Sequence, residues 1–468
     1  MIVRIARKEL TEMFRDGRFR VLSVVVLGVS LVSLAAGWKH YRDVNRQHEA
    51  AQAETRAQWL GQGRKNPHSA AHYGVYAFKP KSQLAMLDTG IDPYVGVASW
   101  LEAHKQNEFK YRPAQDRTAL QRFGEMSAAE ALQVLMPLFI VLMTFSAYAG
   151  EREQGTLRQL LSLGVARRDL AWGKALGITT ALALVLAPAI VLGVAALAFT
   201  AETGLLLDDW WRPALMAATY AAYFAILIGV SLAVSAWART SRLALIVLLG
   251  FWFMNSLVAP RVVSDVAGWM YPTPSAVEFQ KGLEAELNDN RAVQQRLERR
   301  KQELFATYSV DSVDALPVAF SGISLQEGEE HANEVFDRHY GALHERYELQ
   351  NRASSFGAVV APMLAARALS MGLAGTDFAQ HRHFAAAAEQ YRRHIQRVMN
   401  DDIARNQKRG QVYVAGEDLW AQVPEFVYTA PPVGWVLSNL SGSVALLGVW
   451  LVAAVALMLR VTATASVD

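Results

Sequence analysis

The sequence predicts an all-α membrane protein with six transmembrane helices, an N-terminal amphipathic interfacial helix and two large, mainly helical extracytoplasmic segments. Six apolar runs are long enough to cross a bilayer, and 52% of the 468 residues are hydrophobic while 19% are charged. A charged segment, Ala149–Lys174, separates the second run from the third. It has to lie in water, because a charged side chain at the bilayer centre costs at least about 2.5 kcal/mol. Its Arg and Lys side chains place it on the cytoplasmic side.

Composition excludes several classes of function. The net charge is only +3, and the basic residues are spread along the chain beside apolar runs, so no nucleic-acid partner is predicted. The chain has no cysteine, which excludes disulfides, thiol catalysis and cysteine-ligated metal sites. It also lacks the G-x-x-x-x-G-K-[ST] loop that holds ATP phosphates. We therefore expect neither an enzyme nor a cofactor or metal bound by this chain.

The first twenty residues predict an amphipathic helix lying in the membrane interface. Ile2, Ile5 and Leu10 recur on one face, with basic side chains largely elsewhere. A simple basic flank before the first span is the alternative. The first span itself lacks a small-residue cleavage site at its end and is expected to be retained.

Charge and turn residues set the remaining boundaries. The short cytoplasmic connections are rich in Arg and Lys, and the short outside loop is acidic and ends in paired tryptophans, so both termini are expected in the cytoplasm. Pro188 should kink the third span, and the fifth should end at Pro260. The predicted order is 1–20 interfacial helix, 21–38 first span, 39–131 extracytoplasmic, 132–148 second span, 149–174 cytoplasmic coupling segment, 175–199 third span, 200–212 outside loop, 213–236 fourth span, 237–242 cytoplasmic turn, 243–259 fifth span, 260–432 extracytoplasmic domain, 433–459 sixth span and 460–468 cytoplasmic tail.

Both outside segments are expected to be polar and mostly helical. The first begins as a helix over Tyr41–Gln62 and then becomes loop-like, with several X-Pro pairs. The second predicts helices over Val277–Tyr308, Leu325–Phe356, Ala361–Leu373 and Thr376–Gln407. Long polar helices with narrow apolar stripes favour an antiparallel bundle or hairpin.

Two stretches of sequence resemble a known family. Residues 136–165 contain the motif E-x-E-x-G-T, formed by Glu151, Glu153, Gly155 and Thr156, and resemble the second-span signature of ABC-2-type transporter permeases. The stretch LAGTDFAQHRHFAAAAEQYRR, Leu373–Arg393, is similar to the subfamily that carries the DUF3526 domain.

The resemblance implies partners and a function. Two permeases, identical or related, would pair in the bacterial inner membrane, and each would dock a separate ATPase that holds ATP and Mg. ATP hydrolysis would drive export of an amphipathic substrate, or its extraction from the lipids of the cytoplasmic leaflet. The outside helices could pair with the second permease, dock a periplasmic partner or form a self-contained bundle.

The charged segment is the predicted coupling site. Charged side chains there can make charge-assisted contacts with a soluble partner, a glycine permits a turn or close approach, and a threonine can cap the helix that follows. A solvated loop that only maintains topology is the alternative. The predicted coupling residues are Glu151, Glu153, Gly155, Thr156, Arg158, Arg167 and Arg168.

The other polar residues give weaker indications of a functional site. The spans have few ionisable groups, which argues against an ion-coupled carrier. Asn255 is a candidate for the substrate path, and the alternative is a hydrogen bond to a neighbouring helix. His381 and His383 stand two residues apart and would not face each other on a helix, so ordinary packing is expected rather than a metal site.

Two other functions compete with export. The same architecture could transmit ATP-driven movement to an outside partner without moving cargo. A membrane scaffold or an intramembrane enzyme without an ATPase is the third possibility, although no H-E-x-x-H motif is present.

Overall fold

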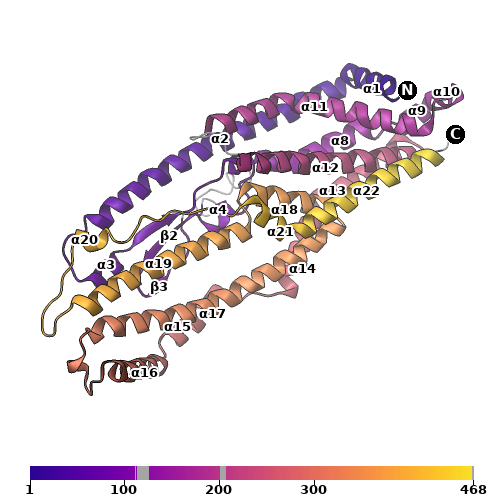
Figure 1. Cartoon of the computed structure of the whole chain (residues 1–468). Helices are drawn as coiled ribbons and strands as arrows, with labels where there is room; N and C mark the ends of the chain where they lie inside the picture. The colour runs from indigo at the N-terminus through magenta and orange to yellow at the C-terminus, as the bar shows by residue number, and fades with distance from the viewer. Residues whose placement is uncertain (111, 113–125, 201–206, 466–468) are drawn as a thin grey trace.

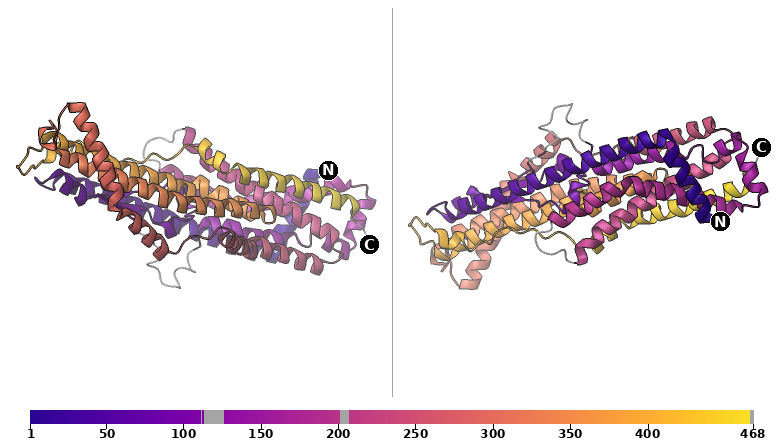
Figure 2. Two further views of the ribbon diagram at one scale, coloured as in Figure 1. Left: turned by 90° about the horizontal axis from the view of Figure 1, so that it is seen from below. Right: turned by 90° about the horizontal axis from the view of Figure 1, so that it is seen from above.

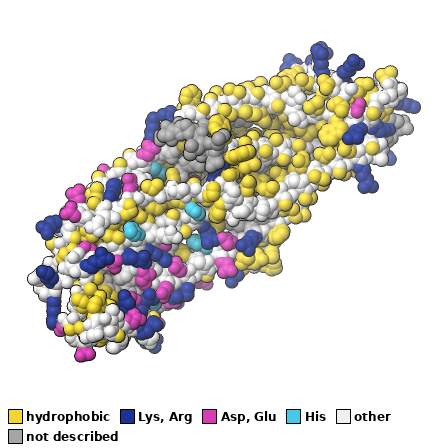
Figure 3. Space-filling view, in the orientation of Figure 1, with side chains coloured by type: hydrophobic (Ala, Val, Ile, Leu, Met, Phe, Trp, Pro, Cys, Tyr) yellow, Lys and Arg dark blue, Asp and Glu magenta, His cyan; other side chains and the backbone are white. Residues whose placement is uncertain are grey.

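The computed structural model describes residues 1–110, 112, 126–200 and 207–465. The molecule is an elongated array of helices (Figure 1), and both termini lie at the same end of it in both views of Figure 2. We call this the terminal end and the opposite one the distal end. Apolar side chains cover most of the half next to the terminal end, and charged side chains cover the distal half (Figure 3).

Within the described residues, six helices are long and apolar enough to cross a membrane, as the sequence predicts. Many of their side chains face outward, for example Val25, Leu192 and Val452, which are 53%, 53% and 70% exposed. Such a band of exposed apolar side chains fits contact with lipid. The six are α2 (Gly17–Leu60), Ala128–Glu153, α11 (Arg167–Thr200), Trp210–Trp237 within α12 (Leu207–Trp237), Ser241–Met270 and α22 (Ser441–Thr464).

The N-terminal helix α1 (Ile2–Arg15) is amphipathic, as expected, and packs across α11 with Ile5, Ala6 and Glu9 buried. It ends at Asp16, whose side chain accepts a hydrogen bond from the backbone N–H of Arg18 at 2.8 Å. This cap separates α1 from α2 and lets the chain turn between them.

The first span and the polar helix predicted after it form one continuous helix. The chain does not break near Gly37 into a second, polar helix, because α2 continues for 44 residues, or about 66 Å at 1.5 Å per residue. A Cβ at Gly37 would lie 2.0 Å from the carbonyl oxygen of Met86. This glycine therefore lets a neighbouring loop lie close to α2, and the helix continues through it.

Two spans contain π-helical turns. In the second span α7 (Ala128–Glu130) passes through such a turn into α8 (Met136–Thr144) and then α9 (Ala149–Glu153). In the fifth, α13 (Ser241–Phe253) passes through a π turn at 254–258 into α14 (Ala259–Met270). The prediction that this helix ends at Pro260 is wrong. Proline has no N–H to donate to the preceding turn of a helix. Pro260 is tolerated because it stands in the first turn of α14, directly after the π turn, where the helical hydrogen bonds change register.

The segment after α2 carries a small sheet that the sequence patterns did not predict. Its three antiparallel strands are ordered β1-β2-β3, and Tyr76 on β1 packs against Trp100 on β2 with ring centroids 4.6 Å apart. The strands are too short to show a clear alternation. The elements here are α3 (Pro67–Tyr73), β1 (Val75–Phe78), a 3-10 turn (Gln83–Met86), α4 (Asp92–Val95), β2 (Ala98–Glu102) and β3 (Lys105–Gln106).

The larger distal segment is helical. The helix predicted over Val277–Tyr308 is broken in two, because Asp289 caps a new helix by accepting a hydrogen bond from Arg291 N–H at 3.1 Å. Short 3-10 turns occupy 313–315 and 357–359. The helices are α15 (Ala276–Leu287), α16 (Asn290–Tyr308), α17 (Phe320–Phe356), α18 (Pro362–Ala374), α19 (Phe378–Asn406) and α20 (Glu417–Trp420).

Helix α18 lies among the spans, although the sequence placed it in the outside domain 260–432. It packs against α12 and α22, and Ala365, Ala366 and Leu369 are almost completely buried there. Its small, apolar composition suits this packing better than a solvated bundle. The sixth span also differs from the prediction of one helix over 433–459, because α21 (Val433–Asn439) stops at Leu440 before α22 begins.

Candidate functional site

The chain between the second and third spans forms a short helix at the terminal end. Helix α10 (Thr156–Ser162) is bracketed by Gly155 and Gly164, whose φ angles of +73° and +79° lie in the left-handed region that glycine favours. Leu157 is 1% exposed and packs in the main core, while the neighbouring Leu163 is 80% exposed. The helix is thus anchored on one face and open on the other.

Four charged side chains meet next to the chain that leads into α10, and three of them are largely buried while Lys8 is 39% exposed. The Nζ atom of Lys174, on α11, is 2.8 Å from Glu9 Oε1 and 2.9 Å from Glu151 Oε1. Lys8 Nζ contacts the same Glu151 oxygen at 2.9 Å. The Lys174 side chain is 1% exposed, and its ammonium lies 5.3 Å from the Tyr148 ring centroid. We call Lys8, Glu9, Glu151 and Lys174 the charge cluster.

The charge cluster itself has two ammonium groups and two carboxylates, and the exposed carboxylate of Glu12 also contacts Lys8 Nζ at 3.1 Å. Buried charges are costly unless they are paired and hydrogen-bonded, and here each contact is charge-assisted. Burial disfavours the charged form of Lys8, but the hydrogen bond to Glu151 and the nearby carboxylates outweigh it and raise the pKa of Lys8. The cluster therefore joins α1, α9 and α11 only while all four groups keep their charge.

The next two residues of the motif join two more helices. Arg152 donates to the carbonyl oxygens of Ala238 and Ala236, at 2.5 and 2.7 Å, at the end of α12. Glu153 accepts from the backbone N–H and the hydroxyl of Ser241, at 2.8 and 2.7 Å, at the start of α13. A cation at a helix C-terminus and an anion at an N-terminus are each stabilising. The three consecutive residues 151–153 therefore connect five helices at one point.

The predicted coupling residues divide into two groups in the structure. Glu151 belongs to the charge cluster and is only 12% exposed. Thr156 donates to the Glu151 carbonyl at 3.1 Å, and Arg167 donates to the Ala465 carbonyl at 2.5 Å. Glu153 is exposed but engaged with the start of α13. Gly155, Arg158 and Arg168 are exposed and available to a partner.

Sequence reasoning missed four residues of this site. Lys8, Glu9 and Arg152 read as ordinary charges, and Lys174 as one more basic residue of the loop. One signal was present, because Lys174 stands between two glycines spaced four apart, Gly173 and Gly177, in an apolar helix. Such spacing marks close helix contact, which makes a charge there hard to solvate.

Asn255 is 2% exposed and lies in the π turn of the fifth span. Its Oδ1 accepts from Met363 N–H at 3.2 Å, and its Nδ2 donates to Tyr223 and Ser256 at 3.0 and 3.3 Å. Both sides of the amide are used, so in this structure it joins helices. A contact with cargo stays a prediction.

Asn255 also ends a buried chain of hydrogen bonds. Ser370 Oγ donates to Asp88 Oδ2 at 2.5 Å and lies 2.8 Å from the Tyr220 hydroxyl. Gln133 Nε2 donates to that hydroxyl at 3.1 Å, and its carbonyl accepts from Tyr223 at 3.2 Å. Burial raises the pKa of Asp88. In order, the polar chain runs through Asp88, Ser370, Tyr220, Gln133, Tyr223 and Asn255.

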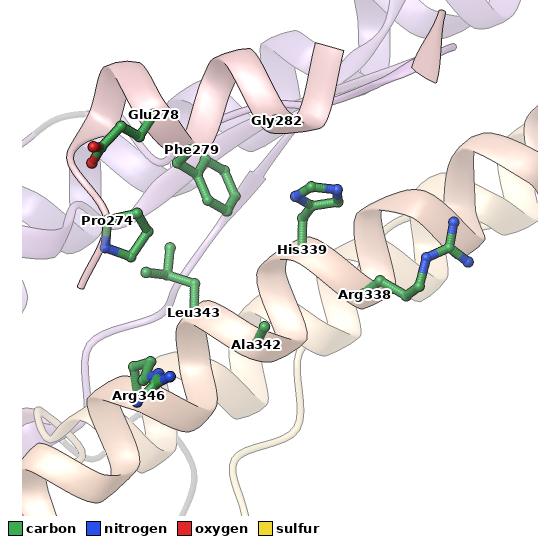
Figure 4. Close-up of a pocket in the computed structure, with 9 residues that line it drawn as sticks. All are labelled: Pro274, Glu278, Phe279, Gly282, Arg338, His339, Ala342, Leu343 and Arg346. Carbon is green, nitrogen blue, oxygen red and sulfur yellow. The ribbon is translucent and has the colours of Figure 1, made fainter. Parts of the chain in front are cut away.

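In the distal half, His381 and His383 have different partners, and a groove opens elsewhere on the surface. His381 packs against Phe109, whereas His383 lies 3.0 Å from the Tyr428 hydroxyl. A groove of about 380 Å³ lies between α15 and α17, with Phe279 and His339 on its facing walls (Figure 4). It is far along the molecule from the charge cluster.

These features define a multi-pass, mainly helical membrane protein with a polar distal half and a charged junction at the terminal end. A family model described as ABC-2 family transporter protein matches residues 3–300, and the chain belongs to that family. A second model, Domain of unknown function (DUF3526), matches residues 276–429. A search of the curated proteins found no match. Both families are those that the sequence motifs indicated.

Family membership identifies the chain as a membrane permease subunit of an ABC transporter and implies association with ABC ATPase subunits. Permeases of this family are generally non-catalytic. The DUF3526 match begins at the first residue of α15 and includes α18. The domain is therefore built into the span bundle as well as into the distal half.

Proposed function

We propose that this chain is the permease of an ATP-driven exporter in the bacterial inner membrane, with a separate ATPase docked on α10. The observation that carries the proposal is an exposed helix whose Leu157 packs in the main core and whose Thr156 donates to the carbonyl of Glu151, a member of the charge cluster. Arg158 and Leu163 offer a cation and an apolar contact to a soluble partner, while Leu157 reaches the core. ATP and Mg would bind to the ATPase.

The distribution of charge supports a cytoplasmic location for the terminal end. Lys and Arg side chains gather there in Figure 3. Helix α1 carries four basic residues, Arg4, Arg7, Lys8 and Arg15, and Arg18 follows at the start of α2. Basic residues next to spans favour the cytoplasmic side. On this orientation both termini are cytoplasmic and the distal half is periplasmic.

The motif provides the path by which the ATPase would act on the spans. A push on α10 reaches α1 and α11 through Glu151, α12 through Arg152 and α13 through Glu153. Rigid helices with paired ends move as bodies, so one contact would shift several spans together. A second permease, identical or related, would complete the pathway.

The apolar character of the spans favours an amphipathic substrate taken from the membrane. Each of the six helices has an 18-residue window with at most two charged residues. Ion-coupled carriers instead place carboxylates or histidines near the midplane.

A second function is favoured by the length of α2. It runs from the terminal end to the distal end as one helix (Figure 1), and its Trp59 donates to the Trp420 carbonyl at 2.8 Å. ATP-driven tilting of α2 would move the distal half even if no cargo crossed. This is mechanotransmission to a periplasmic partner.

The test uses the full chain in nanodiscs with the ABC ATPase that co-purifies with it. We expect Arg158→Glu and Leu163→Asp to weaken docking at least about tenfold, because a hot-spot contact is worth about 2 kcal/mol or more. Permease-stimulated ATP hydrolysis should fall with it. Arg291→Glu is the matched control, since this distal side chain is 91% exposed.

Unchanged docking in both α10 variants would overturn the proposed interface. If no ATPase co-purifies with the unaltered chain, the chain is a scaffold. If an ATPase does co-purify, transport assays in proteoliposomes separate the two ATP-driven functions. An exporter moves lipid or amphipathic cargo across the bilayer, whereas mechanotransmission changes only distances in the distal half.

A further inference from the structure

Three histidines meet in the distal half. His68 and His72 stand one turn apart on α3, and His104 occupies the turn between β2 and β3. The three pairs of ring centroids are each 4.9 Å apart, and one nitrogen from each ring lies within 4.8 Å of the others. Two histidines at i and i+4 on a helix are a common arrangement for binding zinc.

A buried carboxylate fixes the third histidine. His104 Nδ1 lies 2.5 Å from Oε1 of Glu329, a side chain with no exposed surface, and the His104 backbone N–H also donates to that carboxylate at 3.2 Å. His104 has φ +63°, an uncommon value for a residue other than glycine, so tertiary contacts hold this turn. With Nδ1–H donated to Glu329, the lone pair of His104 is on Nε2.

A second network fixes His68 in the same tautomer. Asn400 donates its Nδ2 to Gln326 at 3.1 Å, which leaves its Oδ1 to face His68 Nδ1 at 3.4 Å. The lone pair of His68 is then also on Nε2. The two Nε2 atoms are 3.1 Å apart. Two lone pairs at that distance repel each other unless a cation or a shared proton lies between them.

We propose that His68, His72 and His104 bind a divalent transition metal ion of the zinc class. Two nitrogens at about 2.0–2.1 Å from a tetrahedral zinc ion are about 3.3 Å apart, close to the observed separation. Three neutral imidazoles and no carboxylate ligand disfavour Ca²⁺ and Mg²⁺, and the absence of thiolates disfavours Cu(I). His72 and His104 are exposed, so the fourth coordination position opens to solvent.

The ion would join parts of the chain that are far apart in sequence. Its ligands come from the segment after the first span, while Glu329 and Asn400, which orient them, belong to α17 and α19 of the DUF3526 domain. Binding of the metal therefore stabilises the docking of these two parts. This role does not depend on cargo or on the ATPase.

The experiment measures zinc binding by the full chain, purified in detergent with a histidine-free tag. After metal removal and equilibrium dialysis against Zn²⁺ alone, we expect about one tightly bound ion per chain. His68→Ala, His72→Ala and His104→Ala should each lose it, while His394→Ala, an exposed histidine of α19, should not. Equal zinc binding by the three variants and the unaltered chain would overturn the site.

Two further variants keep the test independent of misfolding. Glu329→Gln retains the shape of the side chain, and we expect about 10–100-fold weaker zinc binding, as for other residues that orient metal ligands. His72→Cys should retain Co²⁺ and gain thiolate-to-cobalt absorption, which has a single source because the native chain lacks cysteine. No such band, together with unaltered affinity in Glu329→Gln, would favour a shared proton over a metal.

Discussion

At the scale of single residues, substitution of Lys174 tests most directly how much the charge cluster stabilises the fold. Its ammonium is 1% exposed and contacts both carboxylates of the cluster. Lys174→Met keeps most of the side-chain volume but leaves Glu9 and Glu151 facing a single ammonium. Removing one partner of a buried ion pair costs about 3–5 kcal/mol, so we expect a clearly lower unfolding temperature in nanodiscs.

Two variants control this measurement. Lys39→Met removes a solvent-exposed lysine that pairs with Asp43 on the surface of α2, and it should leave the unfolding temperature unchanged. Lys174→Met combined with Glu151→Gln removes one charge of each sign, leaves the Lys8–Glu9 pair and should recover part of the loss. If Lys174→Met were as stable as the native chain, the cluster would not hold these helices together.

The motif residues show which features of the site the sequence alone can predict. Its spacing correctly indicated the family, but a sequence does not show which carboxylate is buried. Glu151 and Glu153 are two residues apart, yet one contacts α1 and α11 and the other caps α13. Their roles depend on Lys8 and Ser241, which are distant in sequence, and no local pattern encodes that pairing.

At the scale of elements, the seam between α1 and α11 depends on two glycines. A Cβ at Gly173 would lie 2.6 Å from Ile5 Cβ, and one at Gly177 would lie 2.8 Å from the Ala6 carbonyl oxygen. The G-x-x-x-G spacing thus lets the two backbones approach. Gly177→Val should displace α1, at a cost of about 1–3 kcal/mol typical of overpacking.

Displacement of α1 can be followed by maleimide labelling of Ala6→Cys, a buried position in a chain without native cysteine. We expect faster labelling when Gly177→Val is added. Gly28→Val is the matched control, because a Cβ there meets no atom within 4 Å. Equal labelling rates in the two backgrounds would mean that α1 does not rest on this seam.

Hydropathy predicted the elements better than their ends. All six spans are found, because each needs a long apolar run whatever its neighbours are. The boundaries predicted at Trp38 and Pro260 both fall inside continuous helices. Helix α18 was assigned to the outside domain because its 13 residues are too few to span a bilayer.

At the scale of the whole molecule, two continuous connections link the terminal and distal ends. The polar chain from Asp88 to Asn255 passes from the distal half into the bundle, and it crosses from α18 to the second, fourth and fifth spans. The other connection is α2, which contacts α1 and α11 at one end and the Trp420 region at the other. A movement of the spans therefore has a direct route to the distal half.

The stiffness of α2 can be removed without touching either end. Arg46 is exposed and lies on the part of α2 beyond the predicted membrane span. Proline in a helix interior costs about 3 kcal/mol and breaks the axis locally, so Arg46→Pro should leave ATPase docking intact while ATP no longer changes spin-label distances between the distal half and the spans. Arg46→Ala should behave as the native chain does. If the distances still respond to ATP in Arg46→Pro, the distal half is driven through α18 and its polar chain rather than through α2.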